Sequence, residues 1–361
     1  MDSSVKLLSL LSLLLAVPLL IHSTPVRAEI IVTGPNGCAL ADAIRSANSD
    51  ASIGNCTAGS GADTIVAPDG WFVAIDSTLP TVQSELTIRS ETAAGRFTIS
   101  GDFDHKIFRV DGAATRLTLE RIELINGRVG SALGTGGAAL DIDQATVVLI
   151  DSEVSGHQVT DNTGSAIHIV NGSLIIENSL VERNSMRITG NFSPKRTAIY
   201  ARDSLIEVRS STFRQNYGPE PSLIGASIYM DGGDLLFENS LLDEFRYGLR
   251  GEAAVVTIVN STLTTSENSD YQDDLVFFTD TSAVTLRHVT LGQNIVLEDS
   301  ILSAVNTIFN TCLFDGVSTV LDAGNFYRNT SCNGSDDGDG DLLPLDDNGG
   351  PTRTRAIPFP S

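Results

Sequence analysis

Short segments in which apolar and polar residues alternate recur along most of this chain. Six of them carry a polar residue at the same place: VVLIDSEV, LIIENSLV, LIEVRSST, LLFENSLL, VVTIVNST and VTLRHVTL. These marker residues are Asp151, Asn178, Ser210, Asn239, Asn260 and His288, and they recur at intervals of 27, 32, 29, 21 and 28 residues. A repeat of this length is typical of a solenoid, in which each repeat stacks on the next.

A large apolar residue stands eleven positions before each marker residue. These residues are Leu140, Ile167, Ile199, Ile228, Leu249 and Phe277, and Val110 has the same spacing to Arg121. The constant spacing predicts a unit of two short strands facing a common interior, with the variation in length confined to a loop. Val, Ile, Leu and Thr dominate the segments, and the interval fits neither a leucine-rich horseshoe nor a propeller blade. We therefore expect an all-β fold, a parallel β-helix.

The two ends of the repeat region differ from it in composition. ALADAIRSAN, residues 39–48, has the apolar spacing of an amphipathic helix and is predicted to cap the first coil. Residues 336–361 are rich in Gly, Asp and Pro and are predicted to form an acidic tail or loose cap. We therefore expect one β-helix domain over residues 29–335.

Residues 1–28 predict export. An apolar run from Leu7 to Leu20 is followed by small residues at Val26 and Ala28, as in a cleaved secretory signal peptide. An uncleaved membrane anchor is the alternative, although the run is short for a membrane span. Cleavage would leave a secreted or cell-surface protein with no inserted segment.

The chain is strongly acidic, with 45 acidic and 23 basic residues and a formal net charge of −22. Loss of residues 1–28 removes one acid and two bases, which leaves 44 acids against 21 bases and a charge of −23. This charge repels nucleic acid and anionic lipid, so we expect neither as a partner.

The four cysteines form two local pairs, Cys38 with Cys56 and Cys312 with Cys332. In an exported protein, two disulfides that each close a short loop are the natural interpretation. Metal binding is the alternative, but the sequence contains no CxxC spacing and no cluster of histidines.

Several motifs together resemble one family of proteins. They are CALADAIRSAN (38–48), GADTIVAP (61–68), GGAAL (136–140), FRQN (213–216), the region of the second cysteine pair and LDDNGGPTRTRA (345–356). They resemble exported bacterial right-handed parallel β-helix proteins with an N-terminal CSLREA-type motif, which are similar in repeat pattern to polymorphic outer-membrane proteins and share the pectin-lyase-like fold. Ala41 and Asp42 stand where that motif has Arg and Glu. The resemblance implies the right-handed fold and export, and the family has no single activity.

Neighbours of an inward residue on a strand point outward, so the repeat predicts which side chains share the outer face of the first strand. One predicted column consists of Asp111, Asp141, His168, Tyr200, Tyr229, Arg250 and Phe278. The second, two residues further along each strand, consists of Asp143, Val170, Arg202, Asp231, Glu252 and Asp280. We call these two columns the strip.

Aromatic residues in the strip suggest a binding surface. Tyr200 and Tyr229 on adjacent rungs, with Phe278 and His168 further along, are candidates for stacking against the sugar rings of an extended glycan. The alternative is that the tyrosines only stabilise each other across the strands.

The acids of the strip suggest catalysis. Asp231, Glu252 and Asp280 on successive rungs would hold carboxylates about 5 Å apart, close to the separation in retaining glycosidases. Arg202 next to Asp231 is a candidate base, as in the pectate lyases of this broad fold, and crowded carboxylates can also recruit Ca²⁺. The alternative is a solvated ladder partly neutralised by Arg202 and Arg250.

A weak calcium candidate lies in the segment DDGDGD, where Asp337, Asp339 and Asp341 alternate with other residues. Leu342 and Asn348 depart from the pattern of an EF-hand loop, so an acidic tail is the simpler interpretation. We expect no firm cofactor.

The sequence leaves three functions open. The first is a non-catalytic cell-surface or secreted β-helix that acts in adhesion or binds polysaccharide or cell-surface glycan through the strip. The second is a polysaccharide lyase or glycoside hydrolase, and the third is a structural spacer.

Overall fold

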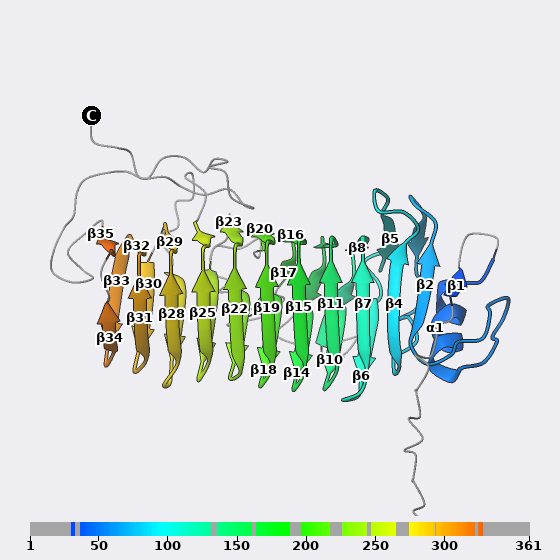
Figure 1. Cartoon of the computed structure of the whole chain (residues 1–361), viewed down its shortest axis with the longest axis horizontal. Coiled ribbons are helices and arrows are strands. Elements are labelled where there is room, and N and C mark those ends of the chain that lie inside the picture. The colour runs from blue at the N-terminus through cyan, green and yellow to red at the C-terminus, as the bar shows by residue number, and fades with distance from the viewer. Residues whose placement is uncertain are drawn as a thin grey trace, which may run out of the picture.

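The computed structural model describes residues 30–32, 37–130, 136–160, 164–187, 196–216, 226–243, 247–264, 274–292, 294–321 and 324–327. Its strands lie side by side along a rod, with a short helix at the N-terminal end (Figure 1). Every strand pairing between successive coils is parallel, and the strands form three long sheets and one short sheet. The predicted all-β fold, a right-handed parallel β-helix with an N-terminal capping helix, is confirmed.

The longest sheet has twelve strands. They are β1 (Ile30–Val32), β2 (Asp63–Ala67), β4 (Glu85–Ser90), β7 (Arg116–Glu120), β11 (Thr146–Ile150), β15 (Ser173–Glu177), β19 (Leu205–Arg209), β22 (Asp234–Glu238), β25 (Val255–Val259), β28 (Ala283–Arg287), β31 (Ile301–Val305) and β34 (Ser318–Leu321).

The nine-stranded sheet carries the strip. It consists of β6 (Phe108–Asp111), β10 (Gly136–Asp143), β14 (Gly164–Val170), β18 (Arg196–Arg202), β21 (Ala226–Asp231), β24 (Tyr247–Glu252), β27 (Asp274–Thr279), β30 (Asn294–Glu298) and β33 (Thr311–Asp315).

The remaining strands form an eleven-stranded sheet and a short three-stranded sheet. The eleven are β3 (Phe72–Ala74), β5 (Phe97–Ser100), β8 (Ile122–Ile125), β12 (Glu153–Ser155), β16 (Leu180–Glu182), β20 (Thr212–Arg214), β23 (Leu241–Asp243), β26 (Thr262–Leu263), β29 (Thr290–Leu291), β32 (Ile308–Phe309) and β35 (Phe326–Tyr327). The three are β9 (Arg128–Val129), β13 (Gln158–Thr160) and β17 (Ser185–Arg187).

The predicted interior row exists. Ile167, Ile199 and Ile228 pair with one another on successive strands, and each side chain is fully buried. Apolar residues of all three long sheets join in one continuous core, which is why strands such as β15, β19 and β22 alternate between buried residues and residues that are at least partly exposed.

The row departs from the predicted spacing at two coils. Val276, not Phe277, pairs with Leu249, because three residues separate β27 from β28 where two separate β24 from β25. At the other coil, Phe108 pairs with Leu140, and Val110 lies two positions further along the strand, because four residues separate β6 from β7. An insertion at a corner therefore shifts the first strand relative to the marker residue.

The marker residues lie at the sharp corner between the twelve-stranded and eleven-stranded sheets. All six, together with Arg121, have a positive φ between 47° and 57°. This left-handed conformation is tolerated best by Asn, Asp and Gly, which explains why polar residues recur there and why three of the six marker residues are Asn. The sequence marker therefore reports a backbone requirement of the fold.

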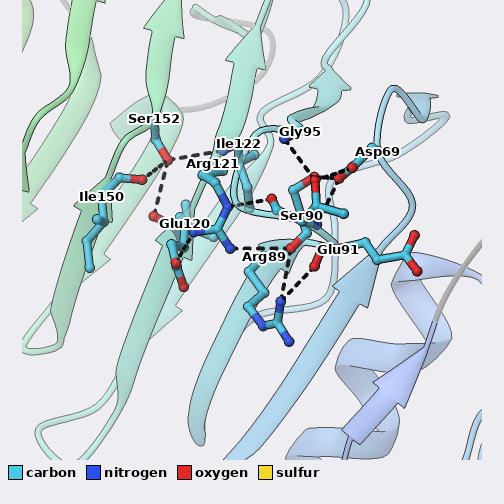
Figure 2. A network of polar contacts seen from close by, with 12 residues as sticks. Asp69, Arg89, Ser90, Glu91, Gly95, Glu120, Arg121, Ile122, Ile150 and Ser152 are labelled. Atoms are coloured by element: carbon cyan, nitrogen blue, oxygen red, sulfur yellow. Dashed lines mark hydrogen bonds and ion pairs between the residues drawn. The ribbon is translucent and has the colours of Figure 1, made fainter.

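A ladder of buried serines follows these corners. The hydroxyl oxygen of each serine accepts the backbone N–H of the equivalent residue in the preceding coil, at 3.0 to 3.1 Å. Each hydroxyl also donates to the carbonyl two residues before it, at 2.7 Å. The members are Ser152, Ser179, Ser211, Ser240 and Ser261, and Figure 2 shows the bonds of Ser152. The serine ladder pairs N–H groups that the turning backbone leaves unpaired.

Figure 2 also shows how side chains fasten a loop of the N-terminal coils. Asp69 accepts hydrogen bonds from the Ser90 hydroxyl (2.6 Å) and the Thr92 N–H (3.1 Å), while Arg121 donates to the Thr92 carbonyl (2.9 Å). The hydrogen bonds from Ser90 and Thr92 hold the pKa of Asp69 below its ordinary value. The loop after β4 is therefore held from both sides.

The N-terminal end is capped as predicted. The helix α1 (Leu40–Ser49) buries Leu40, Ala43, Ile44 and Ala47, and it contacts β1 and β2. A disulfide joins Cys38, just before the helix, to Cys56, as predicted. Cys312 is also disulfide-bonded, but Cys332 lies outside the described residues, so the second pairing stays a prediction.

The predicted signal peptide (1–28) and tail (336–361) lie outside the described residues. Within the described part of the chain, no helix combines the length and apolar character needed to cross a bilayer. The domain limits at residues 29 and 335 also stay predictions.

Removal of one hydroxyl tests the serine ladder. Ser211→Ala deletes the acceptor of the Ser179 N–H and leaves this buried donor unpaired, so we expect a loss of about 1–3 kcal/mol in the free energy of unfolding. Urea denaturation of the whole protein measures it. Ser303→Ala, on the partly exposed outer face of β31, is the control and should change stability by less than about 0.5 kcal/mol. Equal effects of the two changes would contradict the role of the ladder.

Candidate functional site: the strip

The strip lies on the outer face of the nine-stranded sheet, and strand register fixes its members. The observed first column is Arg109, Asp141, His168, Tyr200, Tyr229, Arg250 and Phe277. The observed second column is Asp111, Asp143, Val170, Arg202, Asp231, Glu252 and Thr279. Most of the predicted neighbours are therefore neighbours in space.

Three aromatic rings of the first column form a stack. The rings of His168 and Tyr200 lie 5.4 Å apart, centroid to centroid, at 17°, and those of Tyr200 and Tyr229 lie 5.9 Å apart at 22°. The prediction that the two tyrosines are adjacent is confirmed. Their exposure differs from the expectation of an open platform, because only 3% of Tyr200 and 6% of Tyr229 is accessible to solvent.

Each tyrosine hydroxyl is bonded to an acid of the next coil. The Tyr200 hydroxyl donates to Oδ2 of Asp231 at 2.9 Å, and the Tyr229 hydroxyl donates to Oε1 of Glu252 at 2.6 Å. These bonds run diagonally from the first column to the second, so the tyrosines hold the two carboxylates in place. A phenol that donates to a carboxylate makes a strong, charge-assisted bond.

The other end of the stack carries an ion cluster. Oδ1 of Asp141 lies 3.1 Å from Nδ1 of His168, and Oδ2 lies 3.5 Å from the Lys106 ammonium. Burial raises the pKa of Asp141, but the hydrogen bond from His168 and the charge of Lys106 outweigh it, so the net pKa lies below the ordinary value. Asp141 is therefore a carboxylate, and His168 directs its Nδ1–H toward it.

The pairing of Asp141 with His168 was within reach of the sequence, because both residues fall in adjacent rungs of the predicted first column. The predicted strip did not include Lys106 and Arg109. Lys106 precedes β6 and Arg109 is the second residue of β6, the strand in which the spacing to the marker residue differs by two.

Three predicted members of the strip are elsewhere. Phe278 is fully buried in the core, so its outward position was wrong. Asp280 lies in the corner after β27 with a φ of 53°, and Thr279 takes its place beside Glu252. Asp111 belongs to the second column, where it pairs with Asp143. All three errors follow from the longer corners described above.

The acids that remain in register are Asp231 and Glu252. Both side chains are partly exposed. Arg202, which is the strand-register partner of Asp231, is exposed. Neighbouring parallel strands lie about 4.8 Å apart, so the two residues lie side by side on adjacent strands. This part of the strip offers acceptors and a guanidinium donor to solvent, while the aromatic faces are covered.

Among the described residues, no three His, Cys, Asp or Glu side chains lie close enough together to hold a metal ion. The calcium candidates Asp337, Asp339 and Asp341 lie outside the described residues. The calcium hypothesis for the tail therefore stays a prediction.

No protein-family model and no curated protein matches this chain. Solved structures that align with it include the tailspike protein of an E. coli bacteriophage, at 13% identity and a TM-score of 0.34 over 75% of this chain and 61% of that one. A surface protein and adhesin of Streptococcus pneumoniae aligns at 11% identity and 0.34, over 80% and 92%. A pectate lyase aligns at 11% identity and 0.32, over 88% and 83%.

This chain thus spans less than two thirds of the tailspike chain. At these identities and scores the alignments carry no assignment of function. The similarity to proteins with a CSLREA-type motif stays a prediction from the motifs.

Replacement of one phenylalanine tests the corrected register. Phe278→Ala should cost about 3–5 kcal/mol in the free energy of unfolding, because the ring is fully buried and its loss leaves a cavity. Phe72→Ala, at a ring that is 57% exposed, is the matched control and should cost far less. Urea denaturation compares the two variants, and a small effect at Phe278 would return this residue to the outer face.

Proposed function

We propose that the protein is an exported, non-catalytic β-helix that binds extended glycans at the cell surface or outside the cell. The binding surface is the second column of the strip at Arg202, Asp231 and Glu252. The observation that carries the proposal is the pair of hydrogen bonds by which Tyr200 and Tyr229 fix the two acids. The predicted signal peptide supports export.

The geometry of the column suits a repeating polymer. Equivalent side chains on successive coils are spaced by about 4.8 Å, which is close to the length of one sugar ring in an extended chain. Carboxylate oxygens accept hydrogen bonds from sugar hydroxyls, and the Arg202 guanidinium donates to ring or hydroxyl oxygens. A polymer lying along the rod axis would therefore meet a polar group at each of the three coils that carry Arg202, Asp231 and Glu252.

The tyrosines act as positioning residues in this proposal. Their rings are buried, so we replace direct stacking on a sugar ring by an indirect role: each phenol fixes the position of one carboxylate. Carboxylates fixed before binding lose little conformational freedom when a ligand arrives, which favours affinity.

A second candidate function is a polysaccharide lyase or glycoside hydrolase. It is favoured by the register pairing of Asp231 with Glu252 and of Arg202 with Asp231. A carboxylate separation of about 5 Å is the geometry of retaining glycosidases. Asp280 drops out of this candidate set because it lies in the corner.

A binding experiment tests the proposed function. A panel of neutral and acidic polysaccharides is titrated into the mature protein by calorimetry, and the best ligand is repeated with Asp231→Asn. We expect this change to weaken binding by about tenfold or more, because a hydrogen bond to a charged group is lost. Tyr200→Phe removes the hydroxyl that tethers Asp231 and should weaken binding several-fold.

The control for both variants is Asp234→Asn, at an exposed residue of β22 in the twelve-stranded sheet. It should leave the affinity unchanged. Unchanged affinity in Asp231→Asn would remove the strip from the function.

The same panel separates binding from catalysis. Incubation with and without Ca²⁺, followed by assays for new reducing ends and for unsaturated products, should show no turnover. Product formation that disappears in Asp231→Asn would replace the binding function by the enzymatic one.

A further inference from the structure

A second hydrogen-bond ladder runs inside the coil at the corner after the eleven-stranded sheet. The His157 N–H donates to Oδ1 of Asn184 at 3.2 Å, and the Asn184 N–H donates to Oδ1 of Asn216 at 3.2 Å. One coil earlier, the Gly127 N–H donates to Nδ1 of His157 at 2.9 Å. We call His157, Asn184 and Asn216 the amide ladder, and all three residues are fully buried.

His157 performs the same two tasks as the asparagines. Asn184 accepts with Oδ1 and donates with Nδ2 to the Val154 carbonyl at 3.1 Å, and Asn216 donates likewise to the Val181 carbonyl at 2.8 Å. His157 accepts with Nδ1, so its proton is assigned to Nε2, which lies 2.9 Å from the Leu124 carbonyl. The neutral imidazole therefore replaces a carboxamide in shape and in hydrogen bonding.

The imidazole differs from a carboxamide in one respect, which is that it can gain a proton. A proton on Nδ1 would point at the Gly127 N–H, so that two donors would face each other in a buried site. We propose that His157 is an acid-sensitive latch: protonation of Nδ1 breaks the bond to Gly127 and opens this corner, while the corners held by Asn184 and Asn216 stay closed. This proposal does not depend on glycan binding.

The charged groups on the surrounding elements do not offset this effect, because each has other partners. On β12, Glu153 faces Arg96, and on β9, Arg128 donates to the Phe103 carbonyl. On β16, Glu182 forms ion pairs with Arg183 and Arg214. Lys106 and His168 both contact the carboxylate of Asp141 on β10. His105, which precedes β6, accepts the Arg128 N–H with its backbone carbonyl. None of these groups is among the causes that set the pKa of His157.

Burial lowers the pKa of His157 from 6.5 to about 4, against the opposing effect of its two backbone hydrogen bonds. In the opened corner the imidazole regains its ordinary pKa, so the open form binds more protons between these two pH values. The closed form is therefore fully favoured above about pH 6.5 and loses that advantage as the pH falls to about 4. Over this range the open form should gain roughly a hundredfold.

Opening at this corner would reach the strip. A Cβ atom at Gly127 would lie 2.3 Å from the Ala138 carbonyl and 2.6 Å from Nδ1 of His157, so the backbone is tightly packed here. The same Ala138 carbonyl accepts the Ile107 N–H at 3.0 Å. Ala138 belongs to β10, which also carries Asp141, so acid would loosen the N-terminal end of the strip first.

The test compares the full-length protein with His157→Asn, which places the residue of the next two rungs in the ladder. Amide hydrogen exchange of the segment around Gly127 is measured at pH 7 and pH 4, and the variant is compared with the wild type at each pH. We expect similar protection at pH 7 and roughly a hundredfold weaker protection of the wild type at pH 4. Other acids titrate in both proteins, so their effects cancel in this comparison.

Equal protection of the two proteins at pH 4 would overturn the proposal. Should the variant fail to fold, the wild type decides the matter by NMR of its ¹³C-labelled histidines. The proposal requires one imidazole that remains neutral with its proton on Nε2 well below pH 6. Titration of every folded-state histidine between pH 6 and 7 would also overturn it.

Discussion

The backbone hydrogen bonds between coils must continue through the corners, and the rest of the structure depends on this requirement. Strands pair readily with the coils above and below, but a turning backbone points some N–H groups into the interior, where an unpaired donor is costly. In this chain, side chains that recur once per coil accept hydrogen bonds from these N–H groups. Ser152, Ser179, Ser211, Ser240 and Ser261 serve one corner, and His157, Asn184 and Asn216 serve another.

The same stacking governs the outer face. Side chains in register lie about 4.8 Å apart, so aromatic rings stack and a hydroxyl on one coil reaches an acid on the next. Tyr200 reaches Asp231 and Tyr229 reaches Glu252 in this way. Both tyrosines are buried as well, which leaves the polar groups of the second column as the chemistry available to a partner.

Much of this architecture can be predicted from the sequence, because the repeat is most regular at the positions where the backbone conformation restricts the residue type. The marker residues have a positive φ, and this conformation restricts the side chain strongly enough to leave a visible pattern. That pattern predicted the interior row and the adjacency of Tyr200 with Tyr229 and of Asp231 with Glu252, while the apolar spacing of residues 39–48 predicted the capping helix. The predicted outward position of Phe278 was wrong, because one additional residue in the corner after β27 reverses the face on which each residue of that strand lies.

Other features leave no such trace. The burial of the tyrosines depends on what covers the strip, and the neutral state of His157 depends on the desolvation of its site. Neither quantity is a property of spacing or alternation. The role of His157 becomes apparent only when its equivalents in the next coils are seen to be asparagines.

The ladders also bear on how such a chain can change length over evolution. Each serine meets the same kind of donor above it and the same kind of acceptor below it, whichever coil it belongs to. Duplication or deletion of one complete repeat would therefore join surfaces that already match, whereas insertion of a single residue in a strand would not. The rod can lengthen or shorten by whole coils without a new core having to be selected.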